Sequence, residues 1–565
     1  MSDKSERSSG LLRSFGKSVP ACLLLIILGA VFFIPGLGRV HLFDWDEANF
    51  AEASREMIER ENFLQVTIDY QPFYQKPPLF FWLQALSMKT FGMNEFAARF
   101  VNAVCGMATL AAVFIIGSRI YTVTFGLLWA LAFLGSFLPH FFFKSGVIDP
   151  VFNFFIFLSL TLIAKALLTG NRSRRAGWFA VAGACIGLAT LSKGPVAFLI
   201  IFITMFVYWA SLRFKMFFSS TDIISFLATT AGVALLFFGI ETFSHGTGFI
   251  KNFIAYQIRL FSTGDAGHGR PFYFHFFVIL FGCFPASFFA ILAFVTRSAS
   301  ASPQQLFNRL MIILFWVVLV LFSIVKTKTV LYSSLAWFPV TYLAALYLSE
   351  IIGKKTAIQR PLLISLAVFA FLVCSAISLF PILIIHKEWI VPLIRDKFAL
   401  ACLENPLHWS GYEFLLGTGY GCAVAVSLLF FVKRRHSAGV ATLFGSSAAC
   451  LFLFMFIVAP KIEQYAQGGP VAFYKAHANE NVYVRSLFKS YTDLFYGLKK
   501  PDNNPQSHNL EWLLRGPIDK PAYFVARVTQ SAPYEDTALH LVKIASEYGF
   551  VYYRRDVPGN TIAAK

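Results

Sequence analysis

Long apolar stretches separated by short polar segments make up most of this chain from near its start to about residue 459. A membrane-spanning α-helix needs about 20 apolar residues, because each adds about 1.5 Å across a hydrocarbon layer about 30 Å thick. Such stretches cover residues 18–38, 97–117, 122–140, 150–169, 178–192, 195–212, 223–244, 271–296, 309–325, 333–352, 361–385, 414–432 and 438–459. The pattern predicts an all-α polytopic membrane protein with about thirteen transmembrane helices.

The basic residues between these stretches predict the orientation of the chain. Loops rich in Lys and Arg stay in the cytoplasm. The first stretch follows a basic segment and has no small-residue cleavage site after it, which indicates a retained signal anchor with a cytoplasmic N-terminus. All the strong basic clusters then fall on the cytoplasmic side, namely Arg172/Arg174/Arg175, Arg213/Lys215, Lys354/Lys355/Arg360 and Lys433/Arg434/Arg435.

An odd number of spans places the last segment outside the cytoplasm. We therefore expect two domains, a membrane domain over 1–459 with an outer-face loop at 39–96, and a small soluble α/β domain over 460–565. The tail has strand-like runs at 482–484, 522–526 and 550–553, a turn at 500–505 and an amphipathic helical pattern across 538–548.

Composition supports this interpretation. The chain has 565 residues, of which 57% are hydrophobic and only 14% charged, whereas soluble domains are about a quarter charged. The net charge of +18 would suggest a nucleic-acid partner for a soluble protein. In this chain the strong basic clusters lie in the predicted cytoplasmic loops, so no nucleic-acid partner is predicted. Seven of the eight cysteines lie in apolar runs and Cys402 stands alone, so the sequence indicates neither a disulfide framework nor a zinc cluster.

The outer-face loop carries an acidic, helix-compatible segment from Asp44 to Met57. An ordinary explanation is a solvated acidic first turn that complements the helix dipole. Carboxylates beside hydrocarbon are costly, however, and tend to mark function. The apolar neighbours of Asp46 would desolvate it, so we expect this residue to be a general base. The rigid Pro77-Pro78 turn has the ordinary role of starting an interfacial helix over 79–91. Lys76, directly before it, is a fixed cation suited to a phosphate.

Further ionisable residues recur at the outer ends of the predicted spans. Each has an ordinary interpretation, such as a helix cap for Asp149. Together they violate the expected charge asymmetry, because outer loops are poor in Lys and Arg unless anions bind there. The set comprises Asp149, Lys193, His268, Arg270, Lys328 and Tyr332.

Acids and cations gathered at one membrane face predict a pocket for a phosphorylated lipid beside a base. No GxGxxG or GxxxxGK[ST] loop precedes a helix, and an outer-face enzyme has no nucleotide pool. Glycosyl transfer from a polyprenyl-phosphate sugar fits these constraints. Lys76, Arg270 and Lys328 would stabilise the departing phosphate, and a carboxylate would orient or deprotonate the acceptor.

Several motifs then resemble a known family. The residues from Asp46-Glu47 through Tyr74–Trp82 to Arg99 are similar to the first outer loop of the bacterial aminoarabinose transferases that modify lipid A, GT-C glycosyltransferases related to protein O-mannosyltransferases. Further matching motifs occur in order along the membrane part: Ile148-Asp149-Pro150, 187–195, His268-Gly269-Arg270-Pro271-Phe272-Tyr273-Phe274 and 326–332.

The resemblance implies an inner-membrane enzyme with thirteen spans and a periplasmic C-terminal domain. It implies transfer of a sugar, pentosyl or hexosyl, from undecaprenyl phosphate to a lipid, glycolipid or other envelope acceptor, with inversion at the anomeric carbon. Carried over residue by residue, it implies that Asp46 and Asp149 are the catalytic acids and that Lys76 holds the carrier phosphate.

Two positions depart from the family pattern. Asn49 stands where the aminoarabinose transferases have arginine, and Gln75 where they usually have glutamate. Losing the arginine removes a bidentate phosphate donor. Glu47, Asn49 and Arg55 remain candidate substrate-binding residues, with Arg55 a candidate to compensate. The donor sugar, the acceptor and any need for a divalent metal ion stay open.

Two rival functions remain. A transporter or flippase of a lipid-linked or anionic substrate would carry ionisable groups near the membrane midplane in two related halves, whereas this chain gathers its charges at one face and shows no internal repeat. A lipid-scaffolding protein whose tail binds an envelope partner is the third hypothesis.

Overall fold

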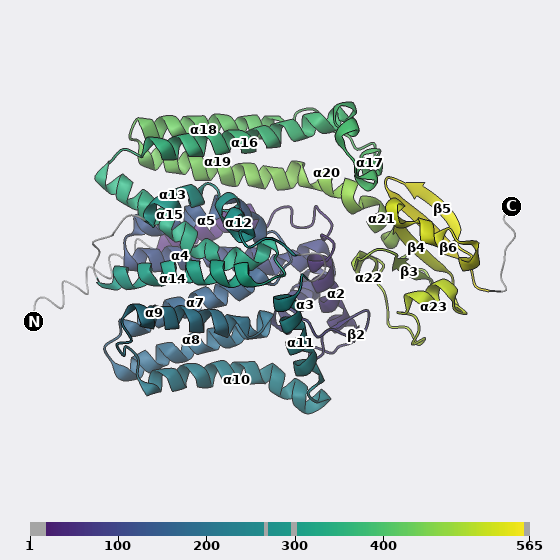
Figure 1. Cartoon of the computed structure of the whole chain (residues 1–565), viewed down its shortest axis with the longest axis horizontal. Coiled ribbons are helices and arrows are strands. Elements are labelled where there is room, and N and C mark those ends of the chain that lie inside the picture. Colours follow the sequence, from purple (N-terminus) through teal and green to yellow (C-terminus); the bar gives the residue numbers. More distant parts are fainter. Residues whose placement is uncertain (1–18, 265–268, 295–301, 559–565) are drawn as a thin grey trace, which may run out of the picture.

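The computed structural model describes residues 19–264, 269–294 and 302–558. A bundle of long helices forms most of the molecule, and a small four-stranded sheet packs at one end of it (Figure 1). The predicted fold class, a polytopic helical protein with a small C-terminal α/β part, is confirmed.

The membrane part is built from apolar helices that follow one another with short connections. Their bounds are Val19–Phe33, α4 (Glu95–Ile120), α5 (Val123–Leu134), α7 (Asp149–Leu167), α8 (Arg172–Lys193), α9 (Val196–Ser211), α10 (Ser220–His245), α12 (Phe274–Gly282), α13 (Ala286–Ala293), α14 (Ser302–Ile324), α15 (Trp337–Lys354), α16 (Arg360–Ile385), α18 (Leu415–Val432) and α19 (His436–Ile457).

Within the described residues, nine helical segments are long and apolar enough to cross a membrane. A tenth candidate is the pair α12–α13, which is bent by 112° where Pro285 interrupts the helix. Three further apolar helices are shorter, Val19–Phe33, α5 and α9. Each of the thirteen predicted stretches corresponds to one of these segments, so the structure describes a helix in every predicted span, although not all reach full spanning length.

Two helices of the outer-face loop were also predicted. Helix α2 (Asp46–Glu59) covers the acidic segment, and α3 (Leu79–Phe91) begins directly after the double proline. Between them a small hairpin pairs β1 (Thr67–Ile68) with β2 (Gln71–Pro72). Helix α11 (Gly248–Ser262) was not predicted, because it has only 15 residues and mixes polar with apolar positions, unlike a membrane span.

The remaining helical segments are short, and most lie in the connections and in the C-terminal part. They are α6 (Phe137–Phe142), η2 (Val330–Ala336), η3 (Lys387–Trp389), η4 (Val391–Leu393), α17 (Lys397–Leu403), α20 (Ala459–Glu463), η5 (Gln464–Gly468), α21 (Gly469–His477), α22 (Thr492–Tyr496), α23 (Leu510–Arg515), η6 (Val528–Gln530), η7 (Ala532–Tyr534) and η8 (Thr537–Leu539).

The C-terminal sheet has the strand order β3-β4-β6-β5. Its strands β3 (Tyr483–Ser486), β4 (Ala522–Arg527) and β6 (Phe550–Arg555) match the three strand-like runs of the sequence. Strand β3 pairs parallel with β4, and β4 pairs antiparallel with β6. The core of this part comprises Phe524, Val551 and Tyr553 from the sheet and Leu513 and Leu514 from α23.

The predicted amphipathic helix across 538–548 is wrong. Most of this segment is the edge strand β5 (Val542–Glu547), which pairs antiparallel with β6. The run is short enough to fit both the helical and the strand periodicity, so its pattern alone does not decide between a helix and a strand. Pairing with β6 satisfies backbone N–H and C=O groups that would otherwise form an open sheet edge.

The C-terminal part packs onto the outer-face loop through a shared apolar core. This core joins Ala48 and Ala51 of α2 and Ala97 and Ala98 of α4 to side chains beyond residue 460, namely Val471, Tyr474, Phe495, Tyr496, Val525, Phe550 and Tyr552. Both regions therefore lie at the same end of the helical bundle (Figure 1).

Polar contacts reinforce this packing. Asp69, in the β-hairpin, forms ion pairs with Lys499 and with Arg485, whose guanidinium lies 2.8 Å from the carboxylate. The Tyr70 hydroxyl and the Arg55 guanidinium both donate hydrogen bonds to the carbonyl oxygen of Lys499, at 2.7 and 2.6 Å. A single surface ion pair contributes little, but these contacts share one small area that is already partly buried.

A buried ion pair fixes the start of α2 against the membrane helices. Arg99 of α4 donates two hydrogen bonds to Glu47, at 2.6 and 3.0 Å, and both side chains are 3% exposed. The remaining guanidinium donors bind the carbonyl oxygens of Leu37, Val40 and His41. Arginine suits this position because its planar fork satisfies several acceptors at once.

We expect Arg99→Met to lower the free energy of unfolding by about 3–5 kcal/mol, because it leaves Glu47 buried without its partner. Thermal unfolding of the purified protein in detergent measures this effect. The double variant Glu47→Gln/Arg99→Met should recover part of the loss. Removing the exposed Lys354–Glu350 pair with Glu350→Gln should cost less than about 0.5 kcal/mol, and an equal loss in both variants would contradict the assigned role.

We expect Asp69→Asn to loosen the C-terminal part, because it removes two ion pairs across the docking surface. Backbone amides in 483–499 should exchange with deuterium about two- to tenfold faster, as measured by hydrogen exchange with mass spectrometry. Glu511→Gln removes a carboxylate that pairs with Arg515 on the exposed side of α23 and should leave this exchange unchanged. Unchanged exchange in Asp69→Asn would show that the apolar core alone holds the two parts together.

Candidate active site

A polar cavity of about 210 Å³ lies where the outer-face loop, the ends of the membrane helices and the C-terminal part meet. Seven separate stretches of the chain border it: 45–50, 73–76, 148–149, residue 193, 256–260, 327–332 and 489–491. Asp46, Asn49, Lys76, Asp149, Lys193 and Tyr332, six of the predicted site residues, line this cavity. The structure thus brings together side chains that are up to about half the chain apart.

Helix α2 presents one face to the cavity. Asp46, Asn49 and Phe50 are three and four residues apart, so they share that face. The residue before the helix, Trp45, has φ 82°, a backbone conformation that bulky side chains rarely adopt. This turn begins the helix at Asp46 and leaves the Trp45 ring on the cavity wall.

Lys76 lies in the loop that ends at the double proline, and Pro77 and Pro78 lead directly into α3. Burial lowers the pKa of Lys76 to about 8, and the charge of Lys193 acts in the same direction. The carboxylates of Asp46 and Asp149 oppose both effects and raise this pKa. The charge of Lys76 therefore depends on pH near neutrality.

Asp149 and Lys193 form an ion pair inside the cavity. Asp149 is the first residue of α7 and the N-cap position belongs to Ile148, so the ordinary cap interpretation does not hold. Lys193 is the last residue of α8, whose end requires Gly194: its φ is 103°, and a Cβ there would lie 2.5 Å from the ring of Phe253. Only glycine fits that turn without displacing a neighbour.

Tyr332 forms the side of the cavity next to this pair, with the Lys193 ammonium 4.8 Å from the centre of its ring. Thr327 and Thr329, from the connection between α14 and η2, line the cavity as well. Aromatic faces attract cations, so Tyr332 helps to hold Lys193 in place beside Asp149.

Two contributions to the cavity were not predicted. Tyr256 and Arg259 come from α11, with the Lys76 ammonium 5.6 Å from the Tyr256 ring centre. Lys489 and Tyr491 come from the C-terminal part; the Lys489 ammonium lies 3.7 Å from the Trp45 ring centre. The pair Tyr256 and Arg259 has helical spacing that was available in the sequence, whereas nothing in the sequence near Lys489 pointed to this site.

Other predicted residues lie outside the cavity. Glu47 is engaged by Arg99, as described above. Arg55 is 1% exposed and forms a bidentate pair with Glu52, with both hydrogen bonds 2.7 Å long. Arg55 therefore does not take the place of the family's arginine at position 49, because it is paired with Glu52 and does not line the cavity.

Two of the three cations that were expected near the phosphate do not line the cavity. Lys328 is buried and donates to the carbonyl oxygen of Val325 at 2.6 Å, and burial lowers its pKa. Arg270 is exposed and does not line the cavity. His268 lies outside the described residues. Within the described part of the chain, no group of three His, Cys, Asp or Glu side chains could hold a metal ion.

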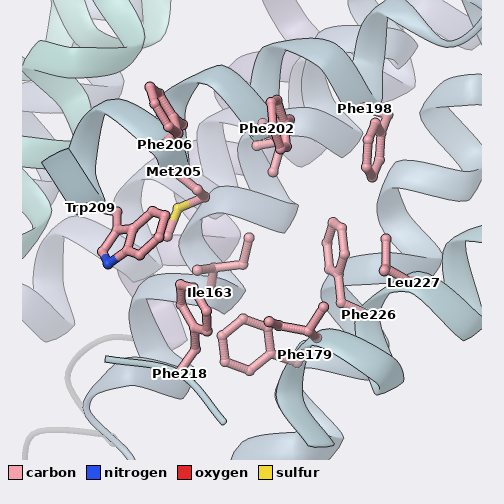
Figure 2. Close-up of a pocket in the computed structure, with 12 residues that line it drawn as sticks. Ile163, Phe179, Phe198, Phe202, Met205, Phe206, Trp209, Phe218, Phe226 and Leu227 are labelled. Carbon is pink, nitrogen blue, oxygen red and sulfur yellow. The ribbon is translucent and has the colours of Figure 1, made fainter. Parts of the chain in front are cut away.

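A larger cavity of about 460 Å³ lies among α7, α8, α9 and α10 (Figure 2). Phe198, Phe202 and Phe206 project into it from successive turns of α9, and Trp209 closes one side. Its lining has no ionisable side chain. It can accommodate hydrocarbon but offers neither a proton acceptor nor a cation, so the polar cavity is the candidate active site.

Known proteins resemble the chain in sequence. The family model described as dolichyl-phosphate-mannose-protein mannosyltransferase matches residues 75–239. A protein of Wigglesworthia glossinidia brevipalpis named undecaprenyl phosphate-alpha-4-amino-4-deoxy-L-arabinose arabinosyl transferase is 25% identical over 57% of this chain and 58% of its own length. A protein of the same name from Pectobacterium carotovorum is 27% identical over 60% of each chain. The matched region thus spans less than two thirds of these relatives.

The fold is shared with a solved structure over nearly its whole length. The crystal structure of ArnT from Cupriavidus metallidurans bound to undecaprenyl phosphate matches with a TM-score of 0.73, covering 94% of this chain and 97% of that one at 16% identity. The chain therefore shares the GT-C type fold of that structure. The resemblance that its motifs indicate is confirmed, because its sequence is similar both to the bacterial aminoarabinose transferases and to the protein mannosyltransferase family model.

Proposed function

We propose that the chain is an integral inner-membrane glycosyltransferase that moves a sugar from polyprenyl phosphate, as undecaprenyl phosphate, to a lipid A, lipopolysaccharide or other envelope acceptor. The observation that carries the proposal is the polar cavity itself. It joins two carboxylates, Asp46 and Asp149, to two lysines, Lys76 and Lys193, at the membrane boundary. Such a combination suits an anionic leaving group beside a proton acceptor.

In the proposed reaction the bond between the anomeric carbon and the donor phosphate oxygen breaks, and its electron pair leaves with the phosphate. An acceptor oxygen forms the new bond from the opposite side, which inverts the anomeric carbon. Lys76 and Lys193 stabilise the negative charge that grows on the leaving phosphate. Because the charge develops in a partly desolvated cavity, these lysines contribute more than they would in water.

Asp46 is the proposed general base. With a hydroxyl acceptor it takes the proton that the acceptor oxygen loses on attack. With a phosphate acceptor, which is already ionised near neutral pH, it positions the acceptor instead. Asp149 is bound to Lys193, so its proposed role is to hold that lysine beside the phosphate.

The comparisons support the donor class, because the names of the relatives specify undecaprenyl phosphate and the structure with the same fold is bound to it. They favour transfer over the rival transport hypothesis. We further propose that the cavity faces the periplasm and that the N-terminus is cytoplasmic. The location of the outer-face loop and of the segment after residue 459 at one end of the bundle supports this orientation and the proposed division into two domains.

Asp46→Asn tests the base. In a reconstituted assay with a polyprenyl-phosphate sugar and envelope glycolipids, we expect turnover to fall at least about 100-fold while donor affinity stays within about threefold, because the amide accepts no proton. Glu59→Gln makes the same change at the exposed end of α2 and should retain turnover. Wild-type turnover in Asp46→Asn would contradict the assignment of Asp46 as the general base. Movement of the substrate across the membrane without product would favour the transport hypothesis.

The lowered pKa of Lys76 predicts how phosphate binding depends on pH. Its charge is present below about pH 8 and is lost above it, whereas undecaprenyl phosphate is already doubly ionised by about pH 7. Affinity for undecaprenyl phosphate should therefore fall about tenfold between pH 7 and pH 9. Equilibrium binding to the protein in nanodiscs measures this change.

Lys76→Arg serves as the matched control, because arginine stays charged throughout this range. Its affinity should be nearly constant between pH 7 and pH 9. A constant affinity in the wild-type protein as well would mean that Lys76 does not hold the phosphate.

A further inference from the structure

Two neutral polar atoms of residues on the cavity wall have no hydrogen-bond partner in the part of the chain that the structure describes. Asn49 is 5% exposed, and its buried Oδ1 has no hydrogen-bond partner among the residues that the structure describes. The same is true of the buried hydroxyl oxygen of Thr329, on another segment of the wall. Buried polar atoms are nearly always hydrogen-bonded, so two unpaired ones on residues that line one cavity indicate where a bound ligand would supply the missing hydrogen bonds.

The charges of the cavity limit what that ligand can be. Four basic side chains line it, Lys76, Lys193, Arg259 and Lys489, against the two carboxylates of Asp46 and Asp149. Asp149 is paired with Lys193, and both carboxylates act electrostatically on Lys76. A phosphate fits the remaining excess of positive charge. An ammonium group on the sugar would be repelled by this excess positive charge, because each carboxylate already interacts with a lysine.

From these two observations we propose that the sugar this chain transfers is uncharged, with its hydroxyl groups hydrogen-bonded to Asn49 and Thr329. The ligand class is a neutral hexosyl or pentosyl unit on polyprenyl phosphate, in contrast to the amino sugar in the names of the relatives. The inference rests on the proposed glycosyl transfer and leaves its bond-forming and bond-breaking steps unchanged.

Neutral partners suit neutral hydroxyls for a physical reason. An amide oxygen accepts a hydrogen bond from a hydroxyl or from an ammonium, but it does not compensate the cost of taking a full charge out of water. Gln75 also lines the cavity and adds another uncharged polar side chain. The wall around Asn49 therefore selects hydroxyl groups by hydrogen bonding and rejects ammonium groups by its net charge.

The test compares donors that share one lipid. Full-length protein in nanodiscs is supplied with undecaprenyl phosphate carrying 4-amino-4-deoxy-L-arabinose, L-arabinose, glucose, galactose or mannose, and transfer to total envelope glycolipid is followed by mass spectrometry. We expect kcat/KM for the best neutral donor to exceed that of the amino donor at least about tenfold. Preference for the amino donor would overturn this inference and leave the proposed function standing. No transfer from any donor would overturn both.

Variants then test the residues themselves. Asn49→Asp adds a carboxylate without changing size and should shift the donor ratio toward the amino sugar by at least about tenfold. Thr329→Val should lower kcat/KM for the neutral donor more than for the amino donor, because it removes a hydrogen bond without changing shape. Asn252→Asp makes the same substitution at an exposed position of α11 outside the cavity and should leave the ratio unchanged. A ratio unaffected by both cavity variants would refute the assigned contacts.

Discussion

Ionised side chains near hydrocarbon must be paired, and the end of this helical bundle that carries the outer-face loop is organised by that requirement. Glu47 is neutralised by Arg99, Glu52 by Arg55 and Asp149 by Lys193. The first two pairs are sealed within the protein, whereas the third borders the cavity. Pairing thus separates charges that hold the fold together from charges that remain available to a ligand.

Helix α2 shows how this separation arises. Successive helical residues are about 100° apart around the axis. Asp46 and Asn49 therefore point into the cavity, while Glu47 is turned away to meet Arg99. Arg55 is nine residues after Asp46, which places it about 180° around the helix from it, so its pairing with Glu52 follows from the geometry of the helix. A cluster of charges that looks uniform in the sequence becomes two surfaces with different roles.

The C-terminal part completes the cavity. Its docking surface combines an apolar core with ion pairs at Asp69, and the loop after β3 brings Lys489 and Tyr491 to the wall beside Trp45. A soluble domain that only covered the membrane part would not need to contribute a cation there. Its packing couples the shape of the site to the contact between two regions more than 400 residues apart in sequence.

The sequence alone determined the features that depend on local pattern: the helices at all thirteen apolar stretches, α2 and α3 in the outer-face loop, and three of the four strands of the C-terminal sheet. It also identified six of the site residues that line the cavity. The length of an apolar stretch, capping residues and prolines are all local features, so they can be recognised within a short segment of the sequence. Tertiary structure decided the rest. Strand β5 forms because β6 offers it a paired edge, Lys328 turns to the Val325 carbonyl, and Lys489 reaches the cavity across the docking surface. Each of these outcomes depends on a partner that folding brings near, and the spacing of residues along the chain does not identify that partner.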